Sequence, residues 1–301
     1  MKLLIVGASG LVGSSLLQVA GAQGHDVLGT RRNQDLPGLA PLDLADVGSC
    51  QRIIGEFQPD AVVCCAAWPW VDGCERDPER AMRENCHQPA ILARIAAQAG
   101  ARFVYISTSY VFDGEDGPYS EDAPTNPTSV YGRSKLDGEN SVLDATAGNA
   151  TIARTMGVYG EEILRKNFVY QVFDTLSVGK RMNVPIDQFG NATYSGDLAR
   201  MLLALLENIS SGIWNTAGPE PGLSRKDFAL RIAGSYRLDP SLFDFMETKS
   251  LGQPARRPRQ GGLRIEKITS DIGLHPSLWV RMDPRERASQ LIPERQRSNV
   301  G

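Results

Sequence analysis

The amino-acid sequence predicts an α/β protein, a doubly wound parallel sheet with a smaller C-terminal lobe. Three observations support this prediction. In the first half, short runs rich in β-branched residues alternate with longer helical patterns, which is typical of βαβ units. A glycine-rich turn connects the first such run to the first helical pattern. After about Gly157 the alternation becomes irregular, so we expect residues 1–157 to form the sheet domain and residues 158–301 the second lobe and tail, with later segments completing the sheet.

The elements of the first half follow from hydrophobic pattern and from end signals. Residues 79–99 form one long helical pattern, with Asp77 as its N-cap, Pro78 at its first position and Gly100 as its stop. Val142 and Ile152 lie in the next helix and strand. The other predicted elements are strands at 2–6, 26–30, 61–65 and 102–107 and a helix at 11–22.

The second half contains helical patterns at 168–177, 195–206 and 225–233, separated by Gly, Pro and Asn. From about Pro254 the chain is rich in Arg and Pro. We expect ordered segments there that pack on the second lobe, followed by a loose tail at 295–301.

The composition of the chain limits the kinds of molecule that the protein is expected to bind. The net charge of −3 offers no broad basic face for nucleic acid or an anionic membrane, so a small molecule is the expected partner. No apolar run is long enough to cross a bilayer, and Gly7 interrupts the apolar start, so we expect a cytoplasmic protein. The five cysteines, which include the adjacent Cys64 and Cys65, match neither a disulfide framework nor a zinc spacing. Reduced thiols and no metal site are expected.

A glycine motif follows the first strand and opens the first helix; it is Gly7-Ala8-Ser9-Gly10-Leu11-Val12-Gly13. Glycine allows a sharp turn, a close approach of the backbone to a pyrophosphate, and tight packing of helix on strand. The helix N-terminus adds free N–H groups and partial positive charge. The motif therefore predicts a Rossmann domain that binds a dinucleotide.

The end of the second strand bears on the choice of dinucleotide. Domains that prefer NAD usually place an acidic residue there, whereas Arg favours the 2′-phosphate of NADP. This chain has Arg31 and Arg32, which favours NADP and leaves NAD as the alternative if both side chains are simply solvated. Asp43 and Leu44, after the third strand, are expected to contact the adenine.

Tyr131 and Lys135 are four residues apart in a helical pattern and therefore share one helix face. A free Tyr, with a pKa of about 10, is a poor acid–base catalyst near neutrality, but a neighbouring cation lowers that value. Thr108, at the end of a strand in the same half, is placed to hydrogen-bond a substrate oxygen beside the phenol.

Together with the glycine motif and the Tyr-x-x-x-Lys pair, segments 106–114 and 118–121 resemble the extended short-chain dehydrogenase/reductase superfamily. Within it the chain is most similar to the dTDP-4-dehydrorhamnose reductase (RmlD-like) group, which also includes the regulatory β subunit of methionine adenosyltransferase. The similarity continues through segments 154–160, 167–168, 187–188, 197–199 and 217–219.

This resemblance implies a seven-stranded parallel sheet, a C-terminal substrate lobe, and hydride transfer from NAD(P)H to a carbonyl carbon. It implies that Tyr131 is the proton donor, that Lys135 activates it and anchors the nicotinamide ribose, and that Thr108 is the third catalytic member. Asn85 matches an Asn near the active site of the family, and the resemblance implies that it binds the cofactor; from the pattern alone it is an exposed polar residue. Cys65, Ala66 and Ala67 are expected at the cofactor rim.

The chain departs from the family pattern mainly on the substrate side. Ser109 stands where the reductases usually have Asp, and Cys64-Cys65 where an Asn usually ends the strand. Trp68 and Trp70 flank a proline and either form an aromatic wall for substrate or pack the loop; Arg257 either binds a diphosphate or is solvated. The candidate substrate residues are therefore Trp68, Trp70, Ser109, Asn167 and Arg257.

Three functions are consistent with these features. The leading hypothesis is an NADPH-dependent reductase of a nucleotide-activated 4-keto-6-deoxy sugar. The second is a reductase of another ketone or an imine in a specialised biosynthetic pathway. The third is a regulatory subunit that binds NADP without turnover. The sequence leaves open whether the chain forms a homodimer.

Overall fold

The computed structural model describes residues 1–33 and 36–284. Its centre is a seven-stranded sheet with the strand order β11-β6-β5-β4-β1-β2-β3, and all strand pairs are parallel. This is the doubly wound order of a Rossmann fold, so the predicted fold class is confirmed. The strands are β1 (Lys2–Val6), β2 (Asp26–Arg31), β3 (Ala40–Pro41), β4 (Ala61–Cys64), β5 (Arg102–Thr108), β6 (Thr151–Thr155) and β11 (Gly212–Asn215).

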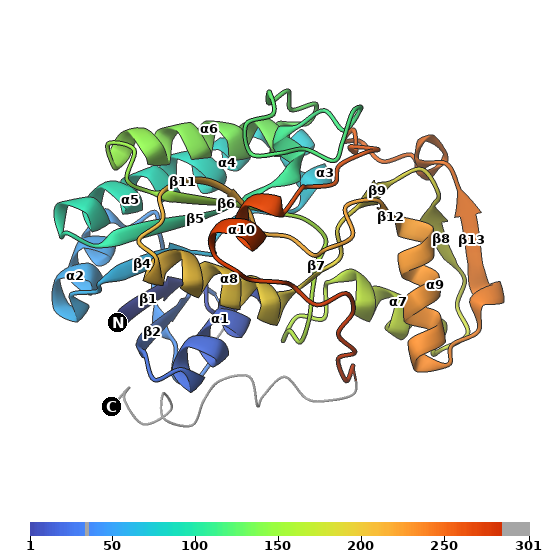
Figure 1. Ribbon diagram of the computed structural model, residues 1–301, viewed down its shortest axis with the longest axis horizontal. Helices are drawn as coiled ribbons and strands as arrows, with labels where there is room; N and C mark the ends of the chain where they lie inside the picture. Colours follow the sequence, from blue (N-terminus) through green and yellow to red (C-terminus); the bar gives the residue numbers. More distant parts are fainter. Residues whose placement is uncertain (34–35, 285–301) are drawn as a thin grey trace.

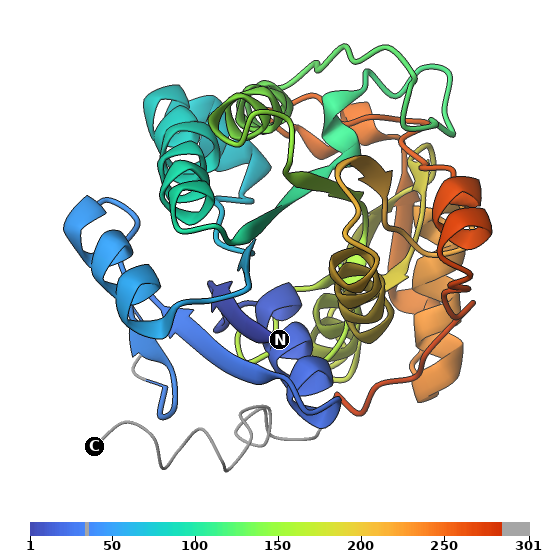
Figure 2. The same cartoon turned by 60° about the vertical axis from the view of Figure 1, so that its left-hand side comes forward.

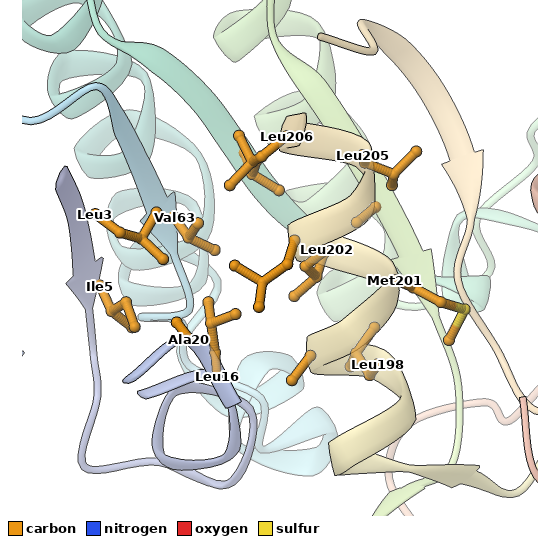
Figure 3. Packing of buried hydrophobic residues seen from close by; sticks show 14 of the residues in the cluster. Leu3, Ile5, Leu16, Ala20, Val63, Leu198, Met201, Leu202, Leu205 and Leu206 are labelled. Atoms are coloured by element: carbon orange, nitrogen blue, oxygen red, sulfur yellow. The ribbon is translucent and has the colours of Figure 1, made fainter. Parts of the chain in front are cut away.

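Helices cover both faces of this sheet (Figures 1 and 2). One face is covered by α1 (Leu11–Ala22) and α8 (Ser195–Glu207), and the other by α2 (Val47–Phe57), α5 (Gln88–Gln98) and α6 (Val130–Ala145). Figure 3 shows Leu16 of α1 and Leu202 of α8 packed with Leu3 and Ile5 of β1. Leu4, the residue between them on the strand, belongs to the core of the opposite face. Every described β1 residue after Lys2 is buried, as expected for an internal parallel strand.

Strand β11 and helix α8 come from the second half of the chain, yet they complete the sheet domain (Figure 1). The predicted helix at 11–22 has the bounds found in the structure, and the predicted helix at 195–206 ends one residue later.

The long helix predicted at 79–99 is interrupted. It consists of α4 (Pro78–Met82), a π-helical turn at Arg83–His87 and α5 (Gln88–Gln98). Asp77 caps it by accepting from the Arg80 N–H at 3.0 Å, as predicted. Pro89 has no N–H to donate to the Asn85 carbonyl four residues earlier, and that carbonyl accepts from the Tyr105 hydroxyl instead. A proline inside the pattern thus explains why a uniform α-helix does not form here.

The second lobe lies beyond one end of the sheet, at the right of Figure 1. Its core includes Tyr159, Val169, Phe228 and Ile232, and Trp279 stacks on Tyr159. Its helices are α7 (Phe168–Leu176) and α9 (Arg225–Tyr236), both at predicted positions. Its short strands pair as β7 (Val158–Tyr159) with β10 (Thr193–Tyr194), β8 (Met182–Pro185) with β13 (Phe243–Met246), and β9 (Phe189–Gly190) with β12 (Leu223–Ser224).

The remaining helical segments are short: α3 (Val71–Arg76), α10 (Glu266–Asp271) and 3₁₀ turns at Ser109–Val111, Pro240–Leu242 and Thr248–Leu251. Within residues 1–33 and 36–284, no helix has the length and apolar character needed to cross a membrane. All five cysteines are free thiols, and Cys65 alone among them is not fully buried. The tail predicted at 295–301 lies outside the described residues.

Candidate active site

A cleft of about 180 Å³ lies at the carboxyl ends of β1, β2 and β4. The glycine turn forms its floor. Gly7 has φ +86°, and a Cβ there would lie 2.8 Å from the Ala66 nitrogen. A Cβ on Gly13 would lie 2.7 Å from the Ala8 Cα. Both positions therefore require glycine, one for its backbone conformation and both for close approach.

Gly10 is the N-cap of α1 and contributes no side-chain acceptor, and the first turn of α1 has no acidic residue. The N-terminus of α1 therefore points free N–H groups and a partial positive charge toward the cleft. No acidic side chain in the first turn of α1 neutralises that charge. A pyrophosphate fits this arrangement, and the cleft residues are compatible with a bound dinucleotide.

Most predicted cofactor residues surround this cleft. Leu11, Val12 and Gly13 form the first turn of α1 behind it, and the Asp43 carboxylate accepts from the Ala45 N–H at 3.0 Å instead of facing it. Five lining residues are not among the predicted ones: Val6, Thr30 and Leu42 lie at strand ends, and Glu84 and Gln88 come from the interrupted helix. The predicted residues that line the cleft are Gly7, Ser9, Gly10, Arg31, Arg32, Leu44, Cys65, Ala66 and Ala67.

The two arginines stand at the rim of the cleft. Arg32 donates from Nη1 to Glu84 Oε2 at 3.2 Å, and Glu84 also accepts from Arg80 Nε at 2.8 Å. The Arg32 side chain is 42% exposed, so its pair with Glu84 contributes little to stability and leaves the guanidinium able to turn toward a ligand.

Helix α6 presents Tyr131 and Lys135 on successive turns. Ser129 caps the helix by accepting from the Gly132 N–H at 3.1 Å, which places Tyr131 in the first turn. The Thr108 side chain lies near enough to the Tyr131 phenol to lower its pKa, so the structure brings these two predicted catalytic residues together. Burial raises the pKa of Tyr131 above its ordinary value, and Thr108 only partly opposes this.

Lys135 is 2% exposed. Its Nζ donates to the Ile106 carbonyl at 2.7 Å and lies 3.9 Å from the centroid of the Tyr105 ring. Burial lowers the pKa of Lys135 to about 8. Burial of both groups favours their uncharged forms and raises the pKa of Tyr131 in this structure, so the activation of Tyr131 by Lys135 stays a prediction.

A buried ion pair lies one turn beyond Lys135 on the same helix. Glu139 accepts from Arg154 at 2.7 Å and 3.0 Å and also from the Ser107 hydroxyl, and both charged side chains are 2% exposed. The negative charge of Glu139 partly opposes the effect of burial on the pKa of Lys135. The pair thus connects β5, β6 and α6 beneath the catalytic residues.

Asn85 lies in the π-helical turn and is completely buried. Its Oδ1 accepts from the Trp68 N–H at 2.7 Å, and its Nδ2 donates to the Trp68 carbonyl at 3.2 Å and to Ser134 Oγ at 3.0 Å. It does not line the predicted cofactor cleft. Its amide is fully occupied in holding the loop after β4 against α6, which keeps it out of that cleft.

A second cavity, of about 520 Å³, lies between the sheet domain and the second lobe. Trp70 and Arg257, both predicted, line it, and so do Tyr110, Phe168 and Arg225. The Tyr110 ring contacts the Tyr131 ring edge-on with centroids 5.5 Å apart. This contact joins the cavity to the candidate catalytic residues.

Three predicted substrate residues do not line this cavity. Ser109 is fully buried, and the next residue, Tyr110, faces the cavity instead. Asn167 caps α7 and donates to the Gly160 carbonyl at 2.8 Å. Trp68 packs beneath the Arg80 guanidinium, 4.2 Å from its ring centroid, so the packing alternative holds for this residue.

Comparisons with known proteins agree with this architecture. A model of the RmlD substrate binding domain family matches residues 1–285. A dTDP-4-dehydrorhamnose reductase of Mycobacterium tuberculosis is 36% identical over 268 residues, which cover 87% of this chain and 84% of that protein. Methionine adenosyltransferase 2 subunit beta of Danio rerio is 31% identical over 296 residues, covering 92% and 90%.

Among solved structures, dTDP-4-dehydrorhamnose reductase from Bacillus anthracis in complex with NADP superposes with a TM-score of 0.83. It is 26% identical, and the match covers 91% of this chain and 94% of that one. The family match and the conserved architecture thus span both the sheet domain and the second lobe. The chain belongs to the RmlD substrate binding domain family.

Proposed function

We propose that this protein is an NADPH-dependent reductase that acts on the 4-keto group of a nucleotide-activated 4-keto-6-deoxy sugar. The observation that supports this most is the position of Tyr131. Its ring contacts the ring of Tyr110, which lines the cavity between the sheet domain and the second lobe, and Thr108 acts on its phenol to lower the pKa. The relatives named dTDP-4-dehydrorhamnose reductase support the substrate class.

The residues suit proton donation. NADPH, when bound in the cleft, supplies a hydride to the carbonyl carbon. The Tyr131 phenol is protonated near neutrality, burial raises its pKa further, and it can donate that proton to the carbonyl oxygen. The Thr108 hydroxyl donates a hydrogen bond to the same oxygen, and protonated Lys135 stabilises the phenolate that remains.

Replacement of Tyr131 by Phe tests this role. The ring and its contact with Tyr110 are kept, but the proton donor is lost, so we expect turnover to fall by about 10²- to 10⁴-fold while NADPH affinity stays unchanged. NADPH oxidation with a panel of 4-keto sugar nucleotides, simple ketones and imines measures it. Tyr236→Phe, which removes a hydroxyl bonded to the Met282 carbonyl in the second lobe, is the control and should keep full activity. Full turnover by Tyr131→Phe would disprove the assignment.

The preference for NADPH is proposed from Arg31 and Arg32, which line the cleft, and from the NADP-bound relative. Replacing both with Ala should raise the Kd for NADPH by about tenfold or more, because charge-assisted bonds to a phosphate are lost. The Kd for NADH should change little. Equal weakening of both cofactors would remove the argument for the 2′-phosphate.

A regulatory role is the second candidate, because the methionine adenosyltransferase beta subunits are relatives of similar identity. The presence of Thr108, Tyr131 and Lys135 favours the enzyme. Tight NADPH binding without turnover of any compound in the panel would favour the regulatory role. If turnover is confined to a ketone or an imine that is not a sugar nucleotide, the specialised-pathway alternative is correct.

We further propose a cytoplasmic location and retain the homodimer as a proposal. Cell fractionation tests the first, and light scattering of the purified protein tests the second.

A further inference from the structure

Two arginines line the large cavity, and they differ in their partners. Arg257 donates from Nη2 to Asp72 Oδ2 at 2.9 Å, so its charge is balanced inside the protein. For Arg225, no carboxylate among residues 1–33 and 36–284 lies within ion-pair distance of the guanidinium. Together the two arginines and Asp72 therefore leave the cavity with one uncompensated positive charge.

The backbone around Arg225 is firmly held. Arg225 is the first residue of α9, its N–H donates to the Gln188 carbonyl at 2.8 Å, and Ser224 caps the helix by accepting from the Asp227 N–H at 2.9 Å. The guanidinium carbon lies 3.4 Å from the centroid of the Phe168 ring, which also lines the cavity. The ring face attracts the cation but gives its N–H groups no oxygen acceptor.

Burial lowers the pKa of Arg225 to about 10, which still leaves the side chain charged near neutrality. Arg225 is partly exposed, but a partly desolvated cation without a counter-ion is still unfavourable, and an anionic oxygen group in the cavity would relieve this cost. Guanidinium presents planar paired donors that suit phosphate and carboxylate oxygens.

Tyr110 connects this cation to the reaction centre. Its ring contacts Tyr131, and both Arg257 and Arg225 act on its phenol electrostatically, opposing the rise in its pKa that burial causes. A group bound at Arg225 would therefore lie near the catalytic phenol and help to orient the sugar.

We propose that Arg225 is a specificity-determining residue that binds an anionic oxygen group of the substrate, either the diphosphate or a carboxylate on the sugar. This inference rests on the proposed function, because it assumes that the large cavity receives the sugar nucleotide. It adds that substrate recognition depends on Arg225, the first residue of α9, whose guanidinium stacks on the Phe168 ring.

Calorimetric titration of the full chain with NADP present tests the proposal. The ligands are dTDP, thymidine, UDP-glucose, UDP-glucuronic acid and inorganic pyrophosphate. Arg225→Met keeps much of the contact with Phe168 and removes the charge, whereas Arg225→Lys keeps the charge. Lys226→Met is the matched control, because Lys226 is the next residue, is exposed, and does not line the cavity.

If Arg225 binds the diphosphate, Arg225→Met should weaken dTDP and both UDP-sugars by about 10- to 100-fold, with thymidine unchanged. If it binds a sugar carboxylate, Arg225→Met should weaken only UDP-glucuronic acid by that factor. Arg225→Lys should recover part of the loss, and Lys226→Met should match the wild type. Wild-type affinity of Arg225→Met for every anionic ligand overturns the proposal.

The outcomes also separate this inference from the proposed function. If wild-type protein binds pyrophosphate, Arg225→Met does not, and no carbonyl is reduced, the anion site stands and the reductase assignment fails. If a 4-keto sugar nucleotide is reduced with unchanged KM and kcat by Arg225→Met, the reductase assignment stands and the role of Arg225 fails.

Discussion

Replacing Gly13 with Ala should damage the cofactor cleft through a single methyl group. The added Cβ would lie 2.7 Å from the Ala8 Cα and 2.9 Å from the Gly7 carbonyl carbon, both of them backbone atoms of the glycine turn. No rotation of a side chain can relieve such a clash, so the first turn of α1 must move away from β1. Helix α1 itself tolerates Ala well, since Gly is the less favourable residue inside a helix.

Gly21, near the other end of α1, is the matched control, because a Cβ there would have nothing within 4 Å. Gly21→Ala should raise the free energy of unfolding by up to about 1 kcal/mol, the difference in helix propensity. Gly13→Ala should gain the same free energy of unfolding from helix propensity, but the clash should lower it by about 1–3 kcal/mol. The two variants should therefore differ in stability by about 1–3 kcal/mol, with Gly13→Ala the less stable.

Urea unfolding measures the stability difference, and fluorescence titration measures NADPH binding. Because the Gly7 turn is expected to bind the pyrophosphate, we expect the Kd for NADPH to rise at least about tenfold in Gly13→Ala and to stay unchanged in Gly21→Ala. If both variants have equal stability and bind NADPH as the wild type does, the close-approach argument for Gly13 is refuted.

Two further predictions concern the buried charges around α6. Glu139→Gln should lower the free energy of unfolding by about 3–5 kcal/mol, because it leaves Arg154 buried without its anion; a loss below about 1 kcal/mol in urea unfolding would contradict this. Burial lowers the pKa of Lys135 from 10.5 to about 8, so between these values the unfolded chain binds more protons and stability should rise with pH. Lys135→Met should remove a rise of up to about 3 kcal/mol, measured as the difference between the pH dependences of wild type and variant; identical pH dependences would refute it.

The first βα unit illustrates what can be predicted from the sequence. The strand at 2–6, the glycine turn and the helix at 11–22 are adjacent in the chain, and their signals are local: β-branched residues, required glycines and helical periodicity. The cleft residues around that turn were predicted for the same reason, because the strand ends and the motif define one edge of the sheet.

The predictions that failed depend on which way a side chain points or on contacts with residues far away in the sequence. Ser109 and Tyr110 are neighbours, and only the packed structure decides which of them is buried and which faces the cavity. Asn85 matched a family position, yet its role in holding Trp68 depends on a π-helical turn next to Pro89. Arg225 was missed because the capping pattern at Ser224 predicts where the helix begins but not what its first residue will face.

From the sequence alone, period, glycine placement and residue spacing predict a Rossmann domain, because these are properties of nearby residues. The resemblance to a reductase family then implies Tyr131, Lys135 and Thr108 as the catalytic set. Tertiary structure alone decided that burial raises the pKa of the Tyr131 phenol and that Arg225 in the cavity has no carboxylate within ion-pair distance among residues 1–33 and 36–284. Desolvation and charge balance depend on segments far apart in the chain, such as α6 and β5 in the sheet domain, or α9 and α7 in the second lobe, and these meet only when each lobe is folded.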